Sequence, residues 1–338
     1  MKKIIAWIVG IVLALLVLAA GAAYVWYQDA LNPVSSAEAE KVRVRIDSGS
    51  TFDQIGKDLE DKKLIRSSLA FTLYARMSGA HAKLQAGTYS LSPNESTQQI
   101  MNHLTSGNVD QFSITFLPGA TLAENRAGLI KAGYSEAEVD AALNKTYQSP
   151  LFEDKPAGTD LEGYIYGETY TFSSDVSVEG ILEEIFKQFY SVLTENNLIT
   201  GLKSHGLNLY QAITLASIIQ REEPNPEAQR QVAQVFYLRL AKDMPLGSDV
   251  TAYYGADKIG AERSVAVDTP YNTRIHKGMP PGPIATPGLT ALQAVADPAA
   301  GDFLYFVSGD DDVTYFSRTV EEHEKNAAEH CKIKCSIP

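Results

Sequence analysis

Histidine, cysteine and clustered basic residues are scarce in this sequence. Of 338 residues, 6 are histidine and 2 are cysteine, and the tail that holds both cysteines does not supply the four ligands of a zinc site. Acidic residues outnumber basic ones by 41 to 29, for a net charge of −12, and no Lys/Arg block follows Lys2 and Lys3. Wrapping a polyanion such as DNA requires such blocks. We therefore expect no metal site and no nucleic-acid partner.

Common catalytic motifs are missing as well. The sequence has no G-x-S-x-G, no Walker phosphate-binding loop and no H-E-x-x-H, which excludes nucleotide and metalloprotease chemistry of those types and leaves no cofactor to expect. The composition, with 45% hydrophobic and 21% charged residues, is that of a folded protein,. The length predicts two domains, one small and one large.

Residues 4–27 form one long apolar run without a charge, IIAWIVGIVLALLVLAAGAAYVWY. As a helix rising about 1.5 Å per residue, this run spans the roughly 30 Å hydrocarbon core of a bilayer. A cleaved signal peptide is the alternative, but the run exceeds the roughly 7–15 apolar residues of a signal and ends in Tyr24, Trp26 and Tyr27. We expect a retained single-pass anchor in the cytoplasmic membrane, with residues 1–3 cytoplasmic and the remainder outside.

The rest of the chain predicts an α+β protein of several parts. Residues 28–41 are polar and are expected to form a tether, and 331–338 a tail. A strand at 42–46, helices after residue 51 and over 67–78, and a strand at 84–91 look like a LysM module, assigned to 42–111. A larger mixed domain, 112–330, has its main helices expected near 121–131, 135–146, 177–195, 207–223 and 228–243, and a hairpin over 302–317.

The two cysteines, Cys331 and Cys335, lie four positions apart in the tail sequence CKIKC. A small disulfide loop is possible in an oxidising compartment, but two cysteines at this spacing on a continuing helix could not be joined. The sequence leaves the disulfide open.

Glu222 ends an apolar stripe on the helix predicted over 207–223, which Pro224 terminates. Desolvation and the negative end of the helix dipole both favour the protonated form of such a carboxyl. A general acid needs this form to protonate a glycosidic oxygen. A solvated carboxylate, or one paired with Arg221 or Arg230, is the alternative interpretation.

Other carboxylates and tyrosines stand in apolar or Gly/Pro-rich surroundings, which indicates a carbohydrate site. Glu168 lies in GYIYGETYTF and Asp249 in PLGSDVTAYYG. Sugars stack on tyrosine rings, although ordinary half-buried packing is the other interpretation for Tyr166, Tyr170, Tyr253, Tyr254 and Tyr271. Residues 271–286 are too rich in Pro and Gly for regular structure and predict a stiff functional loop.

In this order, the segments resemble the endolytic murein transglycosylases of the YceG-like family. The resemblance covers residues 42–328 and rests on the anchor, the LysM-like module and the motifs ASIIQREE, SDVTAYYG, TPYNTR, GMPPGPIATPG, DFLYFV and FSRTVEEH. Glu222 matches the catalytic glutamate of the family. The chain departs from the family pattern at Gln220, Gly247, Val250 and Thr314, and Gly167-Glu168-Thr169-Tyr170 replaces Pro-Asp-Thr-Tyr.

The resemblance implies cleavage of the β-1,4 bond between N-acetylmuramic acid and N-acetylglucosamine inside nascent peptidoglycan strands, leaving 1,6-anhydro ends and terminating elongation. Glu222 would act as acid and then as base. Expected substrate contacts are Gln220, Glu168, Tyr170, Ser248, Asp249, Tyr271, Asn272 and Thr273. Implied partners are peptidoglycan synthases (glycan polymerases) and proteins of the divisome or of elongation.

Two alternatives remain open at this point. A lysozyme-like hydrolase would need a second carboxylate, Asp249 or Glu168, about 5–9.5 Å from Glu222. A catalytically weak wall-binding scaffold is the other, and Gln220 in place of a glutamate favours it.

Overall fold

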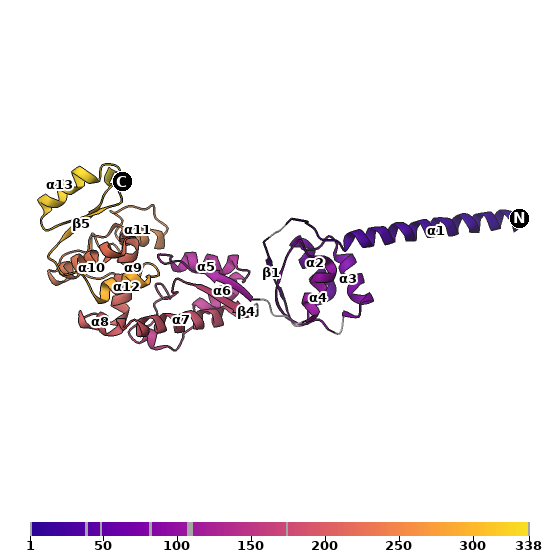
Figure 1. Ribbon diagram of the computed structural model, residues 1–338, viewed down its shortest axis with the longest axis horizontal. Coiled ribbons are helices and arrows are strands. Elements are labelled where there is room, and N and C mark those ends of the chain that lie inside the picture. Colours follow the sequence, from indigo (N-terminus) through magenta and orange to yellow (C-terminus); the bar gives the residue numbers. More distant parts are fainter. Residues whose placement is uncertain are drawn as a thin grey trace. The chain divides into compact units, whose positions relative to one another are not determined.

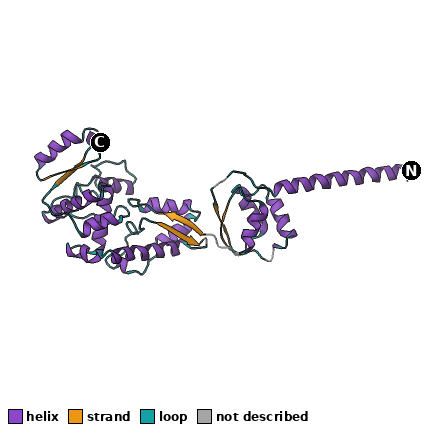
Figure 2. Cartoon of the chain, viewed as in Figure 1, coloured by secondary structure: helices purple, strands orange, loops and turns teal. Residues whose placement is uncertain are grey.

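The computed structural model describes residues 2–37, 40–47, 49–80, 83–106, 111–173 and 175–336. Its fold is α+β and rich in helix, and the described strands pair in twos (Figure 2). The chain divides into two compact units, Met1–Ser113 with Thr171–Val176, and Ile114–Tyr170 with Ser177–Pro338. The prediction of a mixed α+β fold is confirmed.

The first unit begins with α1 (Lys2–Ala30), drawn in indigo in Figure 1. Its part Gly10–Ala30 has a mean hydropathy of 2.1, and its most apolar 18-residue window is not buried in the protein, so it is long and apolar enough to cross a membrane. The helix continues beyond Tyr27, and Ala30 and Leu31 are buried against Ala70. The first residues of the predicted tether are therefore packed against folded structure.

The rest of this unit has the predicted order strand, helix, helix, strand. It contains β1 (Val42–Ile46), α2 (Phe52–Asp61), α3 (Ser68–Met77), β2 (Gly87–Leu91) and α4 (Thr97–Ser106). The strands β1 and β2 pair antiparallel, with Val44 opposite Tyr89. Apolar residues at helical spacing on α2 enter one core with residues of both strands: Val44, Ile46, Phe52, Ile55, Leu59, Phe71, Tyr89 and Leu91,.

Next along the chain, β3 (Gln111–Thr115) pairs with β4 (Thr169–Ser173). The chain between these two strands forms α5 (Leu122–Lys131), α6 (Glu136–Leu143) and the 3₁₀ helix η2 (Pro150–Phe152). After β4 come α7 (Val178–Glu195), whose apolar face packs on α6 and η2, and α8 (Leu198–Ser204).

Helix α9 (Leu209–Glu222) is the central helix of the second unit. It contacts α8, α10 (Pro226–Ala241), α11 (Asp249–Lys258) and α12 (Leu289–Ala296), and it is buried on all sides from Ala212 to Ile219. A capping box of Asn208 and Gln211 begins it,. It ends at Glu222 because Glu223 is extended (φ −137°) ahead of Pro224,. The predicted helix over 207–223 is confirmed.

The C-terminal part adds a hairpin and a short helix. Strands β5 (Tyr305–Ser308) and β6 (Thr314–Ser317) pair antiparallel, as predicted, and are followed by α13 (Val320–His330) and the 3₁₀ helix η3 (Lys334–Ser336). A disulfide joins Cys331 to Cys335. The bond can close because α13 ends at His330, so the two cysteines do not share a continuing helix.

Candidate active site

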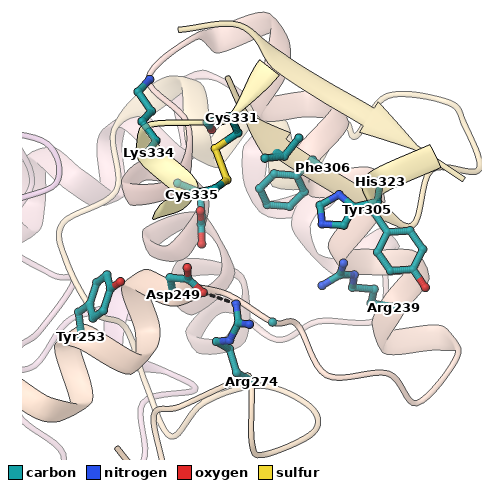
Figure 3. A pocket seen from close by; sticks show the side chains of 14 residues that line it. Arg239, Asp249, Tyr253, Arg274, Tyr305, Phe306, His323, Cys331, Lys334 and Cys335 are labelled. Carbon is teal, nitrogen blue, oxygen red and sulfur yellow. Dashed lines mark hydrogen bonds and ion pairs between the residues drawn. A yellow bond between two sulfur atoms is a disulfide. The ribbon is translucent and has the colours of Figure 1, made fainter. Parts of the chain in front are cut away.

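A pocket of about 800 Å³ lies at the C-terminal end of α9 (Figure 3). Its volume is in the range of ligand-binding pockets. The lining residues come from α9, α10, α11, the β5–β6 hairpin, α13, the tail and two loops: Glu222, Arg239, Gly247, Asp249, Tyr253, Arg274, Tyr305, Phe306, Val307, Ser308, His323, Cys331, Lys334 and Cys335.

Glu222 presents its carboxyl group to this pocket. The side chain is surrounded by protein yet keeps partial contact with solvent. Burial raises its pKa to about 7; the nearby Asp249 also raises it, whereas a hydrogen bond from Ser248 lowers it. At neutral pH the carboxyl group therefore populates both protonation states. Such a group can donate a proton and later accept one.

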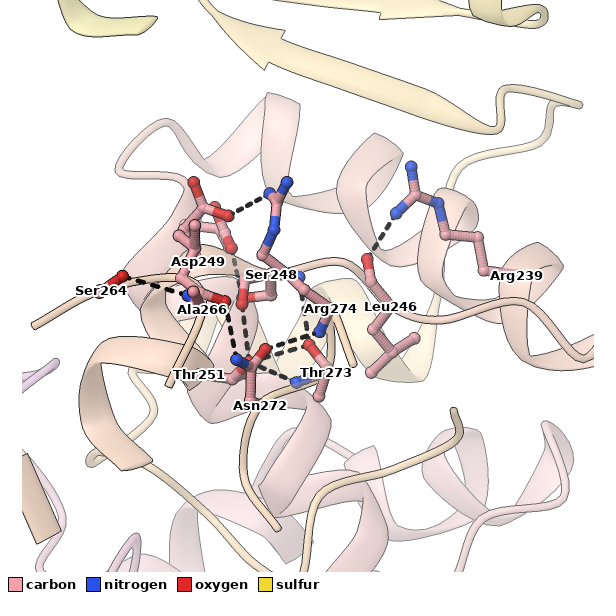
Figure 4. Close-up of polar contacts among 12 residues, drawn as sticks. Arg239, Leu246, Ser248, Asp249, Thr251, Ser264, Ala266, Asn272, Thr273 and Arg274 are labelled. Atoms are coloured by element: carbon pink, nitrogen blue, oxygen red, sulfur yellow. Dashed lines mark hydrogen bonds and ion pairs between the residues drawn. The ribbon is translucent and has the colours of Figure 1, made fainter. Parts of the chain in front are cut away.

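The hydroxyl group of Ser248 contacts this carboxyl group. Its Oγ donates to Glu222 Oε1, and its side chain is buried at the N-cap position of α11. The Ser248 backbone N–H donates to Thr273 Oγ1 at 3.1 Å, and Thr273 Oγ1 lies 2.8 Å from Thr251 Oγ1 (Figure 4). Thr273 thus supports the residue that positions Glu222.

Asn272 has a similar supporting position. It is fully buried, and its amide donates to the carbonyls of Val265 (2.9 Å) and Val267 (2.8 Å). Its Oδ1 accepts the N–H of Arg274 at 3.0 Å. Neither Asn272 nor Thr273 belongs to the pocket lining. The structure therefore places these two predicted substrate contacts beneath the site, where they hold the 265–274 loop.

Asp249 and Arg274 form an ion pair at the edge of the pocket (Figures 3 and 4). Asp249 is the first residue of α11, and Tyr253, one helical turn later, lines the pocket as well. The structure thus brings the predicted residues Ser248 and Asp249 to Glu222. Of the five tyrosines considered above as stacking surfaces for sugar rings, Tyr253 lines the pocket.

The other predicted contacts lie outside the pocket lining. Gln220 accepts the N–H of Gly288 at 2.9 Å and so ties α9 to the start of α12. Glu168 is exposed and accepts from Gln188 (3.1 Å). The remaining two are tyrosines with packing roles: buried Tyr170 donates to the carbonyl of Tyr166, and Tyr271 packs edge-on against Tyr254.

Sequence reasoning missed several pocket residues, among them Arg239, Tyr305 and His323. Tyr305 and His323 lie inside motifs that carry the family resemblance, DFLYFV and FSRTVEEH, which is a signal that could have singled them out. Arg239 lies on α10 and has no comparable signal in the sequence.

Comparison with known proteins agrees with these motifs. Residues 44–329 match the YceG-like family. An endolytic murein transglycosylase of Bacillus subtilis (strain 168) is 32% identical over 323 residues, covering 90% of this chain and 89% of the relative. One from Streptococcus pneumoniae serotype 2 is 29% identical over 369 residues, covering 97% of this chain and 66% of the relative.

A solved structure gives the same result. The crystal structure of a yceG-like protein from Listeria monocytogenes is 32% identical, with a TM-score of 0.57, and the match covers 85% of this chain and 98% of that one. The family match spans most of the sequence, including the helix that ends at Glu222 and the hairpin that closes the pocket. The chain belongs to the YceG-like family.

Proposed function

We propose that this chain is a lytic transglycosylase of peptidoglycan and that Glu222 is its catalytic acid and base. The observation that carries the proposal is the Glu222 carboxyl group at the end of α9, which faces the pocket with a pKa raised to about 7. The curated relatives in Bacillus subtilis and Streptococcus pneumoniae, both called endolytic murein transglycosylases, support the substrate class.

The proposed reaction needs one carboxyl group because the substrate supplies its own nucleophile. Protonated Glu222 gives its proton to the glycosidic oxygen as the bond to C1 of the muramic sugar breaks, which releases a 4-hydroxyl. The carboxylate then takes the proton of the C6 hydroxyl, whose oxygen bonds to C1. The result is a 1,6-anhydro ring and a protonated Glu222, with no water consumed.

Surrounding residues have supporting roles in this scheme. Ser248 orients the carboxylate through its hydrogen bond, and buried Thr273 fixes Ser248. Asp249 and Tyr253 are positioned to contact sugars, since both line the pocket. Gln220, Glu168, Tyr170, Tyr271 and Asn272 lie outside this lining, where each contacts other parts of the protein.

We further propose that α1 remains as a single-pass anchor, with the catalytic unit on the outer side of the cytoplasmic membrane. The two lysines before the apolar run support this orientation,. The strand–helix–helix–strand segment would act as a LysM-like glycan-binding module. An anchored enzyme of this kind would cleave nascent strands beside peptidoglycan synthases, within the division or elongation machinery, and so terminate elongation.

A lysozyme-like hydrolase is a second candidate, because the Asp249 carboxylate lines the same pocket as Glu222. Such an enzyme uses a second carboxylate to direct water or to attack C1. The two candidates share the acid and differ in the product.

Mass spectrometry of the cleaved strands separates them. Purified peptidoglycan incubated with residues 28–338 should yield anhydro-muramic ends, and Glu222→Gln should abolish them, whereas Glu195→Gln, an exposed control on α7, should not. Products with reducing muramic ends would show that the chain is a hydrolase and not a transglycosylase. Unchanged cleavage by Glu222→Gln would show that another group is the acid.

A further inference from the structure

One basic side chain in the pocket forms no ion pair with an acidic side chain. Arg239, Arg274 and Lys334 all line it. Arg274 pairs with Asp249, and Lys334 with Asp312. Within the described part of the chain, Arg239 forms no ion pair, and the carboxyl group of Glu222 acts on it electrostatically without bonding to it. Holding a partly buried cation in a pocket without a bonded acidic partner is unfavourable, so its retention there points to an external anion,.

Backbone carbonyls hold this guanidinium in place. Arg239 Nε donates to the carbonyl of Leu304 at 2.7 Å, and Nη1 donates to the carbonyl of Leu246 at 2.5 Å. These bonds use two of the five N–H groups of the guanidinium. The remaining donors, Nη2 among them, have no partner among the described residues, so they are free for a ligand with oxygen acceptors.

The backbone around Arg239 leaves room for its guanidinium. Gly247 has φ +68°, and a Cβ there would lie 2.8 Å from Arg239 Nη1. Any other residue at this position would adopt an unfavourable backbone conformation and displace the guanidinium. The glycine and the arginine thus belong to one arrangement that keeps the charge at the pocket wall.

Two ring side chains lie beside the guanidinium (Figure 3). Arg239 Cζ lies 5.3 Å from the ring centroid of Tyr305, and the ring of His323 stacks on Tyr305 at 5.5 Å. His323 Nδ1 is buried and has no hydrogen-bond partner in the described structure. Burial and the charge of Arg239 lower the pKa of His323, which favours the neutral imidazole. The group is cationic overall and has unused donors.

We propose that Arg239, with Tyr305 and His323, forms a subsite that binds a carboxylate on the peptide stem of the glycan strand. The inference rests on the proposed function, because it takes peptidoglycan as the substrate. A guanidinium binds a carboxylate through two parallel hydrogen bonds, and such charge-assisted bonds are strong where water is excluded. The subsite would make the enzyme select strands that carry stems near the cleaved bond.

The first test changes the substrate and leaves the protein intact. Strands whose stem carboxylates have been converted to amides should be cleaved at least about tenfold more slowly than untreated strands, since a hydrogen bond to a charged group is lost. Equal rates on the two substrates would overturn the proposal. This measurement does not depend on the folding of any variant.

The second test assigns the effect to Arg239. In Arg239→Gln the ratio of the two rates should fall towards one, while Arg230→Gln, which removes another arginine of α10 bonded to a backbone carbonyl, should keep the wild-type ratio. Arg239→Lys should give a ratio between that of Arg239→Gln and that of the wild type, because lysine keeps the charge but lacks the paired donors of the guanidinium. A wild-type ratio in Arg239→Gln would overturn the assignment.

A binding measurement separates this inference from the proposed function. The inactive variant Glu222→Gln should bind untreated strands more tightly than amidated ones, whatever bond the active enzyme cleaves. Strands freed of stems by an amidase expose the lactyl carboxylate of the muramic sugar. Weak binding of these strands supports a stem carboxylate, whereas binding as tight as that of untreated strands would replace it with the lactyl group and overturn the proposal.

Discussion

The hydroxyl of Ser248 donates a hydrogen bond to the carboxylate of Glu222. This bond joins the last residue of α9 to the N-cap of α11, two helix ends that meet at the pocket. The bond favours the charged carboxylate, while burial favours the neutral acid, and burial dominates. The balance sets the proton affinity of the proposed catalytic group.

Ser248→Ala should raise the pKa of Glu222 further, because the bond that favours the charged form is lost. Activity that needs the protonated acid falls as pH rises through about 7, and in the variant this fall in kcat/KM should move to higher pH. The maximum rate should drop about tenfold, the size of one hydrogen bond to a charged group. Ser204→Ala, on the exposed side of α8, is the control. A profile identical to wild type would show that the bond has no effect in solution.

Asp249→Asn should shift the fall of kcat/KM with rising pH in the direction opposite to the shift expected for Ser248→Ala. The negative charge of Asp249 raises the pKa of Glu222, so neutralising it should move the fall in kcat/KM to lower pH. The strand ends produced by this variant give a second, independent result. Anhydro ends should persist if Asp249 only tunes the acid, and loss of all cleavage would favour the hydrolase, in which Asp249 takes part in the reaction.

Glu162 is a buried carboxyl group that links stability to pH. It accepts the N–H of Leu122 (2.9 Å) and the hydroxyl of Tyr254 (3.0 Å), and burial raises its pKa to about 7. The folded state therefore holds a proton that the unfolded state releases near pH 4.5. This contribution to the free energy of unfolding is complete below that pH and is lost as pH rises through about 7. The total loss is roughly 3 kcal/mol.

Melting temperatures from pH 4.5 to 8 test this linkage. Glu162→Gln should flatten the decline with rising pH, because it keeps the shape and removes the titration. Glu195→Gln should retain the wild-type slope. A variant as pH-dependent as the wild type would assign the decline to other groups.

The Cys331–Cys335 disulfide should matter more for the pocket than for global stability. Both cysteines line the pocket, but so short a loop constrains the unfolded chain by no more than about 2 kcal/mol. Replacing both by serine should raise KM several-fold and change the melting temperature little. Reduction of the wild type should have the same effect, and an unchanged KM in both would exclude a role of the tail in binding.

Much of the architecture follows from local sequence. The apolar run of α1, the period of α9 and its end before Pro224, and the alternating strands of the hairpin are properties of neighbouring residues, so the sequence predicts them. The raised pKa of Glu222 was also foreseeable, because an acid at the end of a buried helix is desolvated. Element ends were predicted less well: β2 begins at Gly87 rather than at residue 84.

Which polar residues reach the pocket was decided by tertiary structure alone. Asn272 and Thr273 lie next to Arg274 in one motif, yet Arg274 lines the pocket while the other two are buried beneath it. Arg239 and Tyr305 converge from elements far apart in the chain. The sequence by itself thus determined the anchor-like helix, the element types and the proposed acid. Packing between distant elements decided its partners, because side-chain direction at a site depends on contacts that local periodicity does not encode.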